Sequence, residues 1–391
     1  MMRTQVGIVG AGPAGLMLSH LLHLEGISTI VLEAHTRDYV EHRIRAGLME
    51  HFSVELLRES GVGERMDREG LVHHGIVLRF GGRSHRIPVT GLTGKSMMIY
   101  GQHEVVKDLV GARLAAGGEI LFEAEAIGID GIHSDQPRIR FRHDGREQEI
   151  ACDFIAGCDG FHGICRPALP DGSLTVYDKI YPFGWLGILA DVAPSNGELV
   201  YANHERGYAL LTMRSPTLSR LYLQCAPDED AAAWSDDQIW AELQTRLSDD
   251  AGFVLKFGPV LQKGVTAMRS YVVEPLRHGR LFLLGDAAHI VPPTGAKGMN
   301  LAFADVVVLS RALIAWYRGG DSDGLENYST TALRRVWKAE RFSWWLTSLM
   351  HRFEQATPFE RRMQAAELDY VTSSPAAMTT LAENYVGLPL A

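Results

Sequence analysis

Near the N-terminus, three glycines stand at the spacing of a loop that binds a phosphate group. Gly10, Gly12 and Gly15 fit the pattern G-x-G-x-x-G directly after the apolar run 5–9. The first glycine of such a loop permits a tight turn, the second lets a pyrophosphate approach the backbone, and the third lets the next helix pack closely. Glu33 follows about 20 residues later, where a carboxylate can hold ribose hydroxyls. The pattern predicts a dinucleotide site, and the alternative is a set of glycine-rich loops without a ligand.

Two acidic turn motifs stand further along the chain. Cys158-Asp159-Gly160 follows an apolar stretch that ends at Ala156. Gly285-Asp286 follows another apolar stretch, 281–284, and continues into the proline-rich segment 290–295. Taken alone, Asp-Gly and Gly-Asp are ordinary turn sequences. Each of these turns therefore indicates a function only in combination with other motifs.

Together with the glycine loop, the two acidic turns resemble the FAD-dependent aromatic hydroxylases. Longer stretches narrow the resemblance to the 4-hydroxybenzoate 3-monooxygenase family, over essentially the whole chain. These stretches are Arg43-Ile44-Arg45-Ala46-Gly47, Tyr100-Gly101-Gln102, Ala156-Gly157-Cys158-Asp159-Gly160-Phe161-His162-Gly163, Tyr181-Pro182-Phe183-Gly184-Trp185-Leu186-Gly187, Tyr201-Ala202-Asn203-His204, Pro292-Pro293-Thr294-Gly295-Ala296-Lys297-Gly298 and Glu383-Asn384-Tyr385-Val386-Gly387-Leu388-Pro389. The resemblance implies an α/β fold with a Rossmann-like FAD-binding domain, an inserted β-sheet lobe for the substrate and a C-terminal helical region.

The resemblance also implies a reaction. A single-component enzyme of this family converts 4-hydroxybenzoate, NAD(P)H and O₂ to 3,4-dihydroxybenzoate, NAD(P)⁺ and water, with a flavin C4a-hydroperoxide as the oxygen donor. Two alternatives stay open: a hydroxylase of a related 4-hydroxybenzoate derivative, and a flavin-binding ligand sensor. Because a mere binder needs no path for protons, the tyrosine and histidine residues described below argue against the sensor.

Several residues are assigned to the flavin by the resemblance. FAD is expected to bind without a covalent bond, because no cysteine or histidine stands in a recognisable tethering motif. Asp286 would meet the ribityl chain, Arg220 would lie near the mobile flavin, and Asp159 would be structural. The expected FAD-binding positions are Gly10, Gly12, Ala14, Gly15, Glu33, Arg43, Ile44, Arg45, Ala46, Gly47, Gln102, Asp286, Met299 and Asn300.

A benzoate carboxylate needs a cationic partner that can donate two hydrogen bonds, and the resemblance places Arg214 there. Tyr222 and the hydroxyl of Thr212 would add hydrogen bonds to the same group, with Met213 beside them. Thr212 stands where many relatives have serine, which keeps the hydroxyl. Leu221 stands where an aromatic residue is common, and we expect this change to loosen the pocket wall.

Hydroxylation requires an electron-rich ring, which ionisation of the substrate phenol provides. The resemblance makes Tyr201 the partner of the phenol oxygen, with Tyr385 next in a proton path and His73 as the relay to solvent. The carbonyl of Pro293 would accept a hydrogen bond from the neutral phenol. Since phenols titrate near 10 and imidazole near 6.5, oriented hydrogen bonds must stabilise the phenolate.

The nicotinamide cofactor would meet Arg45, His162 and Arg166 according to the same resemblance. NADPH-preferring relatives carry an arginine and a glutamine just after the acid that binds the ribose. Here these positions are Ala34 and His35, and Arg37 is followed by Asp38. We therefore expect NADH to be used well, with little or no preference for NADPH.

The elements that must position these residues follow from the apolar pattern. The runs 5–9 and 28–32 are predicted strands around a helix at 14–24, whose residues Leu16, His20 and Leu24 share a side. Further helices are predicted at 104–116, at 236–247 and over most of 299–353, where four tryptophans would pack. Strands are predicted at 120–130, 138–143, 147–156 and 281–284, the last in one sheet with the N-terminal strands. The domains would be 1–180 and 271–391 for FAD, with 181–270 as the substrate lobe.

Composition limits the classes of protein and partner. The chain has 391 residues, 46% of them apolar, and a net charge of −9, which disfavours nucleic acid as a partner. The four cysteines fit no metal-ligand spacing, so no metal site is expected. The run 299–317 contains Asp305 and Arg311, which predicts a buried helix and no membrane span. We expect a cytoplasmic homodimer.

Motifs of other enzyme classes are incomplete or missing in this sequence. The segment 91–96 resembles a Walker A loop but is two residues too short between its glycines. The chain contains no G-x-S-x-G and no H-E-x-x-H. It also lacks the W-x-W-x-I-P sequence expected of a flavin halogenase. A hydrolase, a metalloprotease and a nucleotide phosphatase are therefore not expected.

Overall fold

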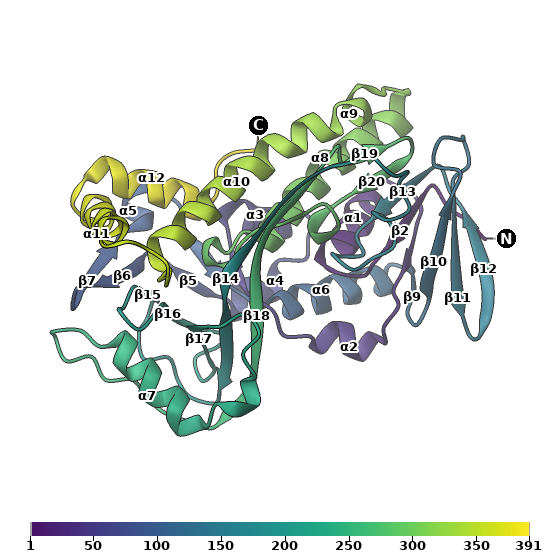
Figure 1. Ribbon diagram of the computed structural model, residues 1–391. Helices are drawn as coiled ribbons and strands as arrows, with labels where there is room; N and C mark the ends of the chain where they lie inside the picture. Colours follow the sequence, from purple (N-terminus) through teal and green to yellow (C-terminus); the bar gives the residue numbers. More distant parts are fainter. Residues whose placement is uncertain (1, 391) are drawn as a thin grey trace.

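A parallel sheet with one antiparallel edge strand organises the first lobe of the computed structural model, which describes residues 2–390 (Figure 1). In order across the sheet, its strands are β19 (Arg277–His278), β20 (Leu281–Leu283), β13 (Phe154–Gly157), β2 (Val6–Val9), β3 (Thr29–Leu32) and β9 (Glu119–Leu121). The run 281–284 therefore joins the N-terminal strands, as predicted. Helices α1 (Pro13–Leu24), α6 (Gln102–Ala115) and α8 (Gly298–Gly319) pack around this sheet.

An eight-stranded sheet forms the second lobe. Its order is β21 (His289–Ile290), β18 (Val260–Glu274), β14 (Thr175–Ala190), β17 (Ser219–Cys225), β16 (Ala209–Met213), β15 (Leu199–Ala202), β6 (Ile76–Phe80) and β7 (Arg83–Ile87). The long antiparallel strands β14 and β18 run from the lower lobe into the upper one in Figure 1. This sheet thus extends beyond 181–270 at both ends and includes strands from the first 90 residues.

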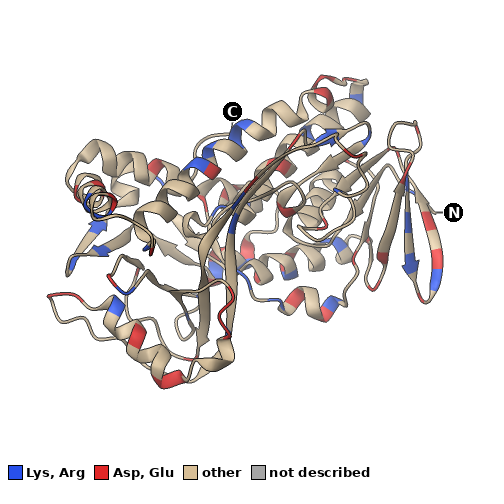
Figure 2. Cartoon of the chain, viewed as in Figure 1, with Lys and Arg blue, Asp and Glu red and all other residues tan. Residues whose placement is uncertain are grey.

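Two small sheets complete the strand inventory. One has the order β1 (Met2–Arg3), β12 (Arg146–Ala151), β11 (Arg138–His143) and β10 (Glu125–Asp130), and the other has β4 (Leu48–Met49), β8 (Met97–Ile99) and β5 (Leu71–His73). In Figure 2, basic and acidic residues alternate along the first of these sheets, where Arg140 lies opposite Glu149. Such cross-strand pairs of opposite charge suit a solvent-exposed meander.

Helices cover the remaining faces. They are α2 (Arg37–His42), α3 (His51–Glu59), α4 (Glu64–Glu69), α5 (Val89–Thr93), α7 (Asp236–Leu247), α9 (Asp323–Glu326), α10 (Tyr328–Met350), α11 (Pro358–Ser373) and α12 (Pro375–Val386). Among the described residues, α8 alone is long and apolar enough to cross a membrane. However, 67% of its apolar stretch is buried inside the protein, as expected of a core helix.

Four details of the elements differ from the sequence-based expectations. The predicted strand 120–130 is two strands of different sheets, because the chain turns at Glu123 with φ +56°. The predicted strand 147–156 is likewise divided, since the backbone N–H of Asp153 bonds to the carbonyl of Gln5 between β12 and β13. Leu24 lies at the end of α1 and is 55% exposed, and Trp344 is 45% exposed. Apolar pattern alone therefore located the segments but not these local exposures.

Candidate active site

The glycine loop has the shape that a dinucleotide requires. A Cβ at Gly10 would lie 2.3 Å from the carbonyl oxygen of Cys158, and one at Gly15 would lie 2.0 Å from the carbonyl oxygen of Gly10. A Cβ at Gly12 would meet nothing within 4 Å. Gly10 and Gly15 are thus needed for close packing, whereas Gly12 borders open space at the N-terminus of α1, where the helix dipole favours an anion.

Glu33 lies at the end of β3 beside this loop. One carboxylate oxygen accepts the backbone N–H of Ala11 at 2.9 Å, and the other lies 2.8 Å from Nδ1 of His35. The side chain is only 12% exposed. The ring of His35 also stacks on Tyr39 with centroids 4.4 Å apart. Glu33 is therefore fixed next to the glycine loop, as a ribose-binding acid must be.

The two motifs 43–47 and 100–102 come together although they are far apart in the sequence. The backbone N–H of Tyr100 donates to the carbonyl of Gly47 at 2.7 Å, and that of Gln102 donates to the carbonyl of Ala46 at 3.0 Å. Arg43 and Arg45 are exposed and their positive charges face Asp286. Ile44 is partly buried between them. This connection between α2 and β4 therefore presents cations toward the Gly285-Asp286 turn.

The Asp159 turn and the Gly285-Asp286 turn lie side by side. Asp159 accepts the backbone N–H of Cys165 at 2.8 Å, which supports its structural assignment. Arg166 donates from Nη1 to the carbonyl of Ala287 at 3.0 Å and stacks on Phe161 at 4.6 Å. Its guanidinium is thus partly engaged within the protein. His162 is exposed, so its ring is accessible from solvent.

The N-terminus of α8 is held by Asn300. The side-chain amide of Asn300 donates to the carbonyls of Leu48 and Ala296, and its oxygen accepts from the backbone N–H of Glu50 and the hydroxyl of Ser53. Both donors and both acceptor positions of this amide are therefore occupied. If Asn300 contacts a cofactor, it does so through its backbone. Met299 is partly buried in the first turn of the same helix.

These observations fit FAD. The open space at Gly12, the fixed carboxylate of Glu33 and the exposed carboxylate of Asp286 provide separate places for a pyrophosphate, a ribose and a ribityl chain. The cations of Arg43 and Arg45 lie on the same side. The chemistry of these groups is therefore compatible with FAD.

Arg214 lies at the end of β16 and is partly buried. Its Nη2 donates to the hydroxyl of Tyr222 at 3.3 Å, and its Nη1 donates to the carbonyl of Met213 at 2.9 Å. Nε has no partner, and among the described residues the guanidinium bonds to a carbonyl and a hydroxyl and to no carboxylate. Burial lowers the pKa of Arg214, which reflects the cost of holding a cation there. A carboxylate ligand would remove that cost.

Tyr222 and Thr212 complete the surroundings of Arg214. Burial tends to raise the pKa of the Tyr222 phenol, but the positive charges of Arg214 and Arg220 lower it overall. Thr212 is 4% exposed and lies opposite Arg220 in the register of β16 and β17. Leu221 instead packs on the other face of the sheet with Ile239 and Trp240 of α7. The expectation that Leu221 loosens the pocket wall was wrong, because alternate residues of a strand face opposite sides.

The hydroxyl groups of Tyr201 and Tyr385 are in direct contact. Tyr201 is 1% exposed on β15 and Tyr385 is 0% exposed on α12. Burial raises the pKa of both phenols, so both remain neutral and can donate a proton. The structure thus brings together the two tyrosines that only the family resemblance linked.

His73 lies on β5 and has no hydrogen bond to either tyrosine among the described residues. It is 2% exposed, and burial lowers its pKa to about 4. Nδ1 is buried without a partner. The residue borders a surface groove of about 560 Å³ that also contacts Met213 and Lys256. His73 therefore lies between the interior and a surface groove, and its lowered pKa favours the neutral imidazole.

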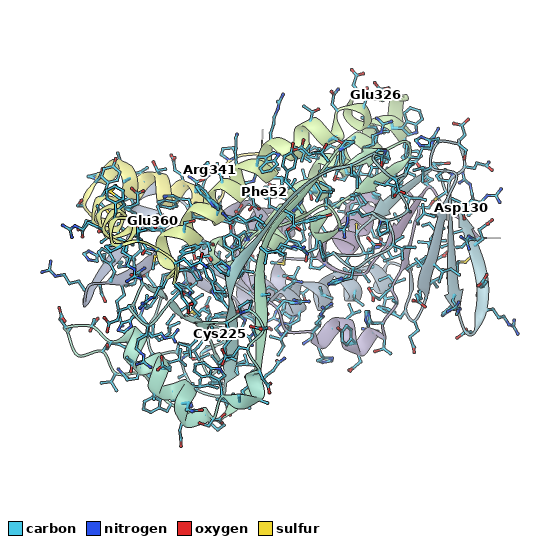
Figure 3. The ribbon with its side chains drawn as sticks, in the orientation of Figure 1. Phe52, Asp130, Cys225, Glu326, Arg341 and Glu360 are labelled. Atoms are coloured by element: carbon cyan, nitrogen blue, oxygen red, sulfur yellow. The ribbon has the colours of Figure 1, made fainter. Side chains whose placement is uncertain are left out.

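Pro293 is exposed in the 3₁₀ turn before α8. Its carbonyl accepts the backbone N–H of Ala296 at 2.9 Å, which leaves one lone pair for a second donor. In Figure 3, Cys225 marks the end of β17 in the lower lobe and Arg341 marks α10 above it. Arg341 donates to the side-chain oxygen of Asn384 at 3.2 Å, next to Tyr385.

Two buried groups near Tyr385 were not predicted. Lys297 donates to Glu50 at 2.5 Å and to the backbone carbonyl of Tyr385 at 3.1 Å, and Glu50 also pairs with Arg335. The buried His351 accepts from Nε1 of Trp185 at 2.6 Å, and burial lowers its pKa to about 3. For Lys297 the sequence held an indication, because it is the one charged residue of the segment 292–298. His351 had no signal, because only the fold places it against Trp185.

Comparison with known proteins agrees with this geometry. The family model described as FAD binding domain matches residues 3–343. p-Hydroxybenzoate hydroxylase of Acinetobacter baylyi is 49% identical over 389 residues, which cover 99% of this chain and 96% of that one. Rifampicin monooxygenase of Streptomyces venezuelae is 25% identical over 340 residues, which cover 81% of this chain and 65% of that one.

Solved structures agree on the fold. The crystal structure of p-nitrophenol 4-monooxygenase from Pseudomonas putida DLL-E4 superposes with a TM-score of 0.84 over 100% of both chains, at 20% identity. The complex of aklavinone-11 hydroxylase with FAD and aklavinone gives a TM-score of 0.75 at 21% identity, over 90% of this chain and 70% of that one. At such low identity, these similarities establish the arrangement of the chain alone.

Fold and site thus define an FAD-binding oxidoreductase of the monooxygenase class. The chain belongs to the family of FAD-dependent aromatic hydroxylases that contains p-hydroxybenzoate hydroxylase, since one such relative is 49% identical over nearly its full length. The family resemblance, the α/β fold class and the FAD cofactor expected from the sequence are confirmed.

Proposed function

We propose that this enzyme hydroxylates 4-hydroxybenzoate at the 3-position. The overall reaction is 4-hydroxybenzoate + NAD(P)H + H⁺ + O₂ → 3,4-dihydroxybenzoate + NAD(P)⁺ + H₂O. The observation that carries the proposal is a pair of polar groups in the second lobe, on strand β15 and at the end of β16. Arg214 has a guanidinium without an acidic partner, and Tyr201 has a hydroxyl in contact with Tyr385. A guanidinium without an acidic partner suits a carboxylate, and a tyrosine hydroxyl suits the oxygen of a phenol. The Acinetobacter relative carries the matching name.

Different residues of the chain bind the substrate and transfer its proton. Arg214, with Tyr222 and Thr212, orients the substrate by its carboxylate. Tyr201 donates a hydrogen bond to the phenol oxygen and stabilises the phenolate, because its own pKa is raised by burial and it stays neutral. The hydroxyl of Tyr385 takes up the departing proton at its oxygen as it releases its own. His73, which has no direct hydrogen bond to Tyr385, passes a proton on to the surface groove. When bound, FAD would supply the redox chemistry, namely hydride uptake from the nicotinamide and reaction with O₂.

The flavin would be held by the two motif groups. The candidate residues are Gly10, Gly12, Ala14, Gly15, Glu33, Arg43, Ile44, Arg45, Ala46, Gly47, Gln102, Asp286, Met299 and Asn300, the last through its backbone. For the nicotinamide cofactor we propose Arg45, His162 and Arg166. His162 is exposed and Arg45 is exposed, which supports contact with a ligand that arrives from solvent.

Substrate-dependent oxidation of NAD(P)H tests the proposal. The purified protein is reconstituted with FAD and mixed with NADH or NADPH, with and without 4-hydroxybenzoate, and the product is identified by mass spectrometry. We expect 3,4-dihydroxybenzoate. Binding of 4-hydroxybenzoate without any oxidation of either nicotinamide would instead support a ligand sensor. Faster turnover of a 3-substituted 4-hydroxybenzoate would favour the related hydroxylase.

We also propose that the protein is a cytoplasmic homodimer. Large apolar side chains are exposed on α10 and α11, with Trp344 at 45%, Phe359 at 72% and Met363 at 52%. Exposed apolar groups of this size support contact with a second copy. All four cysteines are free thiols, which fits a reducing compartment. Sedimentation equilibrium of the protein and of Phe359→Glu tests the dimer, and cell fractionation tests the compartment.

A further inference from the structure

Two buried ionisable side chains of the flavin lobe lie outside the site described above. His289 is on β21 and Asp305 is on α8, and their side chains are 2% and 1% exposed. Nε2 of His289 lies 2.7 Å from Oδ2 of Asp305. The same Oδ2 accepts the backbone N–H of Gly285 at 3.0 Å. One carboxylate oxygen therefore connects the Gly285-Asp286 turn, the strand after it and helix α8.

The turn needs such a connection because its backbone is unusual. Gly285 has φ +57°, a conformation that favours glycine. A Cβ there would lie 3.3 Å from the Cβ of Ala302 on α8, one turn before Asp305. Gly285 and Ala287 are buried, whereas Asp286 between them is exposed. The carboxylate of Asp286 is thus the one side-chain group of the turn that points to the ligand side.

Three carboxyl groups act on His289, whereas the neighbouring strand β18 places the apolar Val272 opposite it. Asp305 contacts it from α8, Asp286 acts from its own loop, and Glu340 acts from α10. Arg43 and Arg45 face Asp286 from the connection 43–47. Burial alone would lower the pKa of His289, but the contact with Asp305 outweighs burial and raises it. For Glu340, burial raises the pKa to about 7.

We propose that His289 and Asp305 form a buried ion pair that positions the Gly285-Asp286 turn for FAD. This inference rests on the flavin site proposed above. Asp305 holds the amide of Gly285, and His289 fixes the rotamer of Asp305 and compensates its charge. Neither residue contacts the flavin in this account, so both are positioning residues. The pair thereby fixes the backbone of the turn that carries the exposed carboxylate of Asp286.

Titration of the apoprotein with FAD tests the inference. We expect Asp305→Asn and His289→Asn to weaken FAD binding about 10- to 150-fold, the range expected when a hydrogen bond to a charged group is lost. Ser310→Ala is the matched control, because Ser310 is also buried on α8 but bonds only to Val307 of its own helix. Unchanged FAD affinity in both site variants would overturn the inference.

The pH dependence separates positioning by an ion pair from loss of structure. In Asp305→Asn, His289 loses its charge partner, so the pH above which FAD affinity declines should move downward relative to the parent. A structural lesion would lower affinity equally at every pH. The profiles are also measured in a Glu340→Gln background, so that titration of Glu340 is not mistaken for that of His289.

A measurement on the unmodified protein tests the ion pair independently of the variants. The ¹⁵N chemical shifts of the His289 ring report its protonation directly in the FAD-loaded enzyme. A doubly protonated ring at pH 7 is expected, and a neutral ring would overturn the inference even if the variants fail to fold. If the unmodified protein binds no FAD at all, the proposed function fails first, and that outcome is distinguishable from normal FAD binding by the two variants.

Discussion

The hydroxyl group of Tyr201 on β15 contacts the hydroxyl group of Tyr385 on α12, although 184 residues separate them in the sequence. The two rings meet edge to face with centroids 6.1 Å apart. Lys297 donates to the backbone carbonyl of Tyr385, so the N-terminal end of α8 lies directly behind this pair. The tyrosine pair, which we propose as a proton path, and the N-terminal end of α8 therefore meet at one buried junction.

Replacing Tyr385 by phenylalanine should interrupt the proton path. We expect the hydroxylation step to slow roughly 100-fold, in the range typical of a lost acid–base group, while reduction of the flavin slows much less. Peroxide release should rise, because reduced flavin then reacts with O₂ without a productive acceptor. Stopped-flow absorbance and product yield per NAD(P)H measure these effects.

Tyr208→Phe is the matched control for this experiment. Tyr208 is equally buried beside Tyr201, but its hydroxyl has no hydrogen-bond partner. Its removal should leave the hydroxylation rate near that of the parent. Equal rates and yields in Tyr385→Phe and the parent would show that the proton leaves by another path.

Arg214→Lys should weaken binding of 4-hydroxybenzoate while FAD stays bound. Lysine keeps the positive charge but cannot donate two parallel hydrogen bonds, and loss of a hydrogen bond to a charged group costs about 1.5–3 kcal/mol, or roughly 10- to 150-fold in affinity. Titration monitored by flavin absorbance gives the dissociation constant. Arg311→Lys, at an exposed position of α8, is the control. Parent-like affinity in Arg214→Lys would assign the carboxylate to another residue.

The choice between NADH and NADPH should depend on the segment after Glu33. Ala34 has no donor, His35 is bonded to Glu33, and Arg37 is paired with Glu41. No free cation of this segment is therefore ready for a 2′-phosphate. We expect kcat/KM to be comparable for the two cofactors, or higher for NADH.

Ala34→Arg should shift the preference toward NADPH by about 10- to 150-fold, the value of one charge-assisted contact. The measurement is kcat/KM for both cofactors with 4-hydroxybenzoate saturating. A parent preference for NADPH above about tenfold would contradict the assignment. In that case Arg37 or a residue outside the segment binds the 2′-phosphate of NADPH.

Glu340 should make stability depend on pH. Burial raises its pKa to about 7, well above the value of 4.5 in an unfolded chain. Between these values the folded chain holds a proton that the unfolded chain has lost, so folding stability falls as pH rises from about 4.5 to 7. The effect is at most about 3 kcal/mol for a shift of this size.

Glu340→Gln should therefore gain stability relative to the parent as the pH is raised. Thermal unfolding at pH 5 and pH 8.5 measures the difference in Tm between the two proteins at each pH. Glu354→Gln, at an exposed position, should show no such trend. A constant difference in Tm for Glu340→Gln would mean that the carboxyl group is ionised in the folded protein across this range.

Local chemistry explains why the nucleotide-binding unit was predictable. The apolar run, the glycine spacing and Glu33 lie within one β-α-β segment, and each residue acts on its neighbours. The helix 236–247 was predicted to the residue, because Ser235 and Gln238 form a capping box at its start. By contrast, the break of 147–156 into two strands depends on a bond from Asp153 to Gln5, which no local pattern reveals.

In the candidate site, too, some features depend on contacts that no local sequence pattern reveals. Tyr201, Tyr385 and Arg214 could be assigned only through family resemblance, because their proximity depends on the packing of β15, β16 and α12. The orientation of Leu221 was missed, since sheet register decides which face a residue occupies. His289 and Asp305 were not predicted as partners, because each looks like an ordinary residue of an apolar segment.

One measurement tests the central claim most directly. The FAD-loaded enzyme is supplied with ¹⁸O₂, 4-hydroxybenzoate and NADH or NADPH, and the aromatic product is analysed by mass spectrometry. The account predicts 3,4-dihydroxybenzoate that carries one ¹⁸O atom, in an amount close to the NAD(P)H consumed. Consumption of NAD(P)H and O₂ with unlabelled 4-hydroxybenzoate recovered unchanged would contradict it.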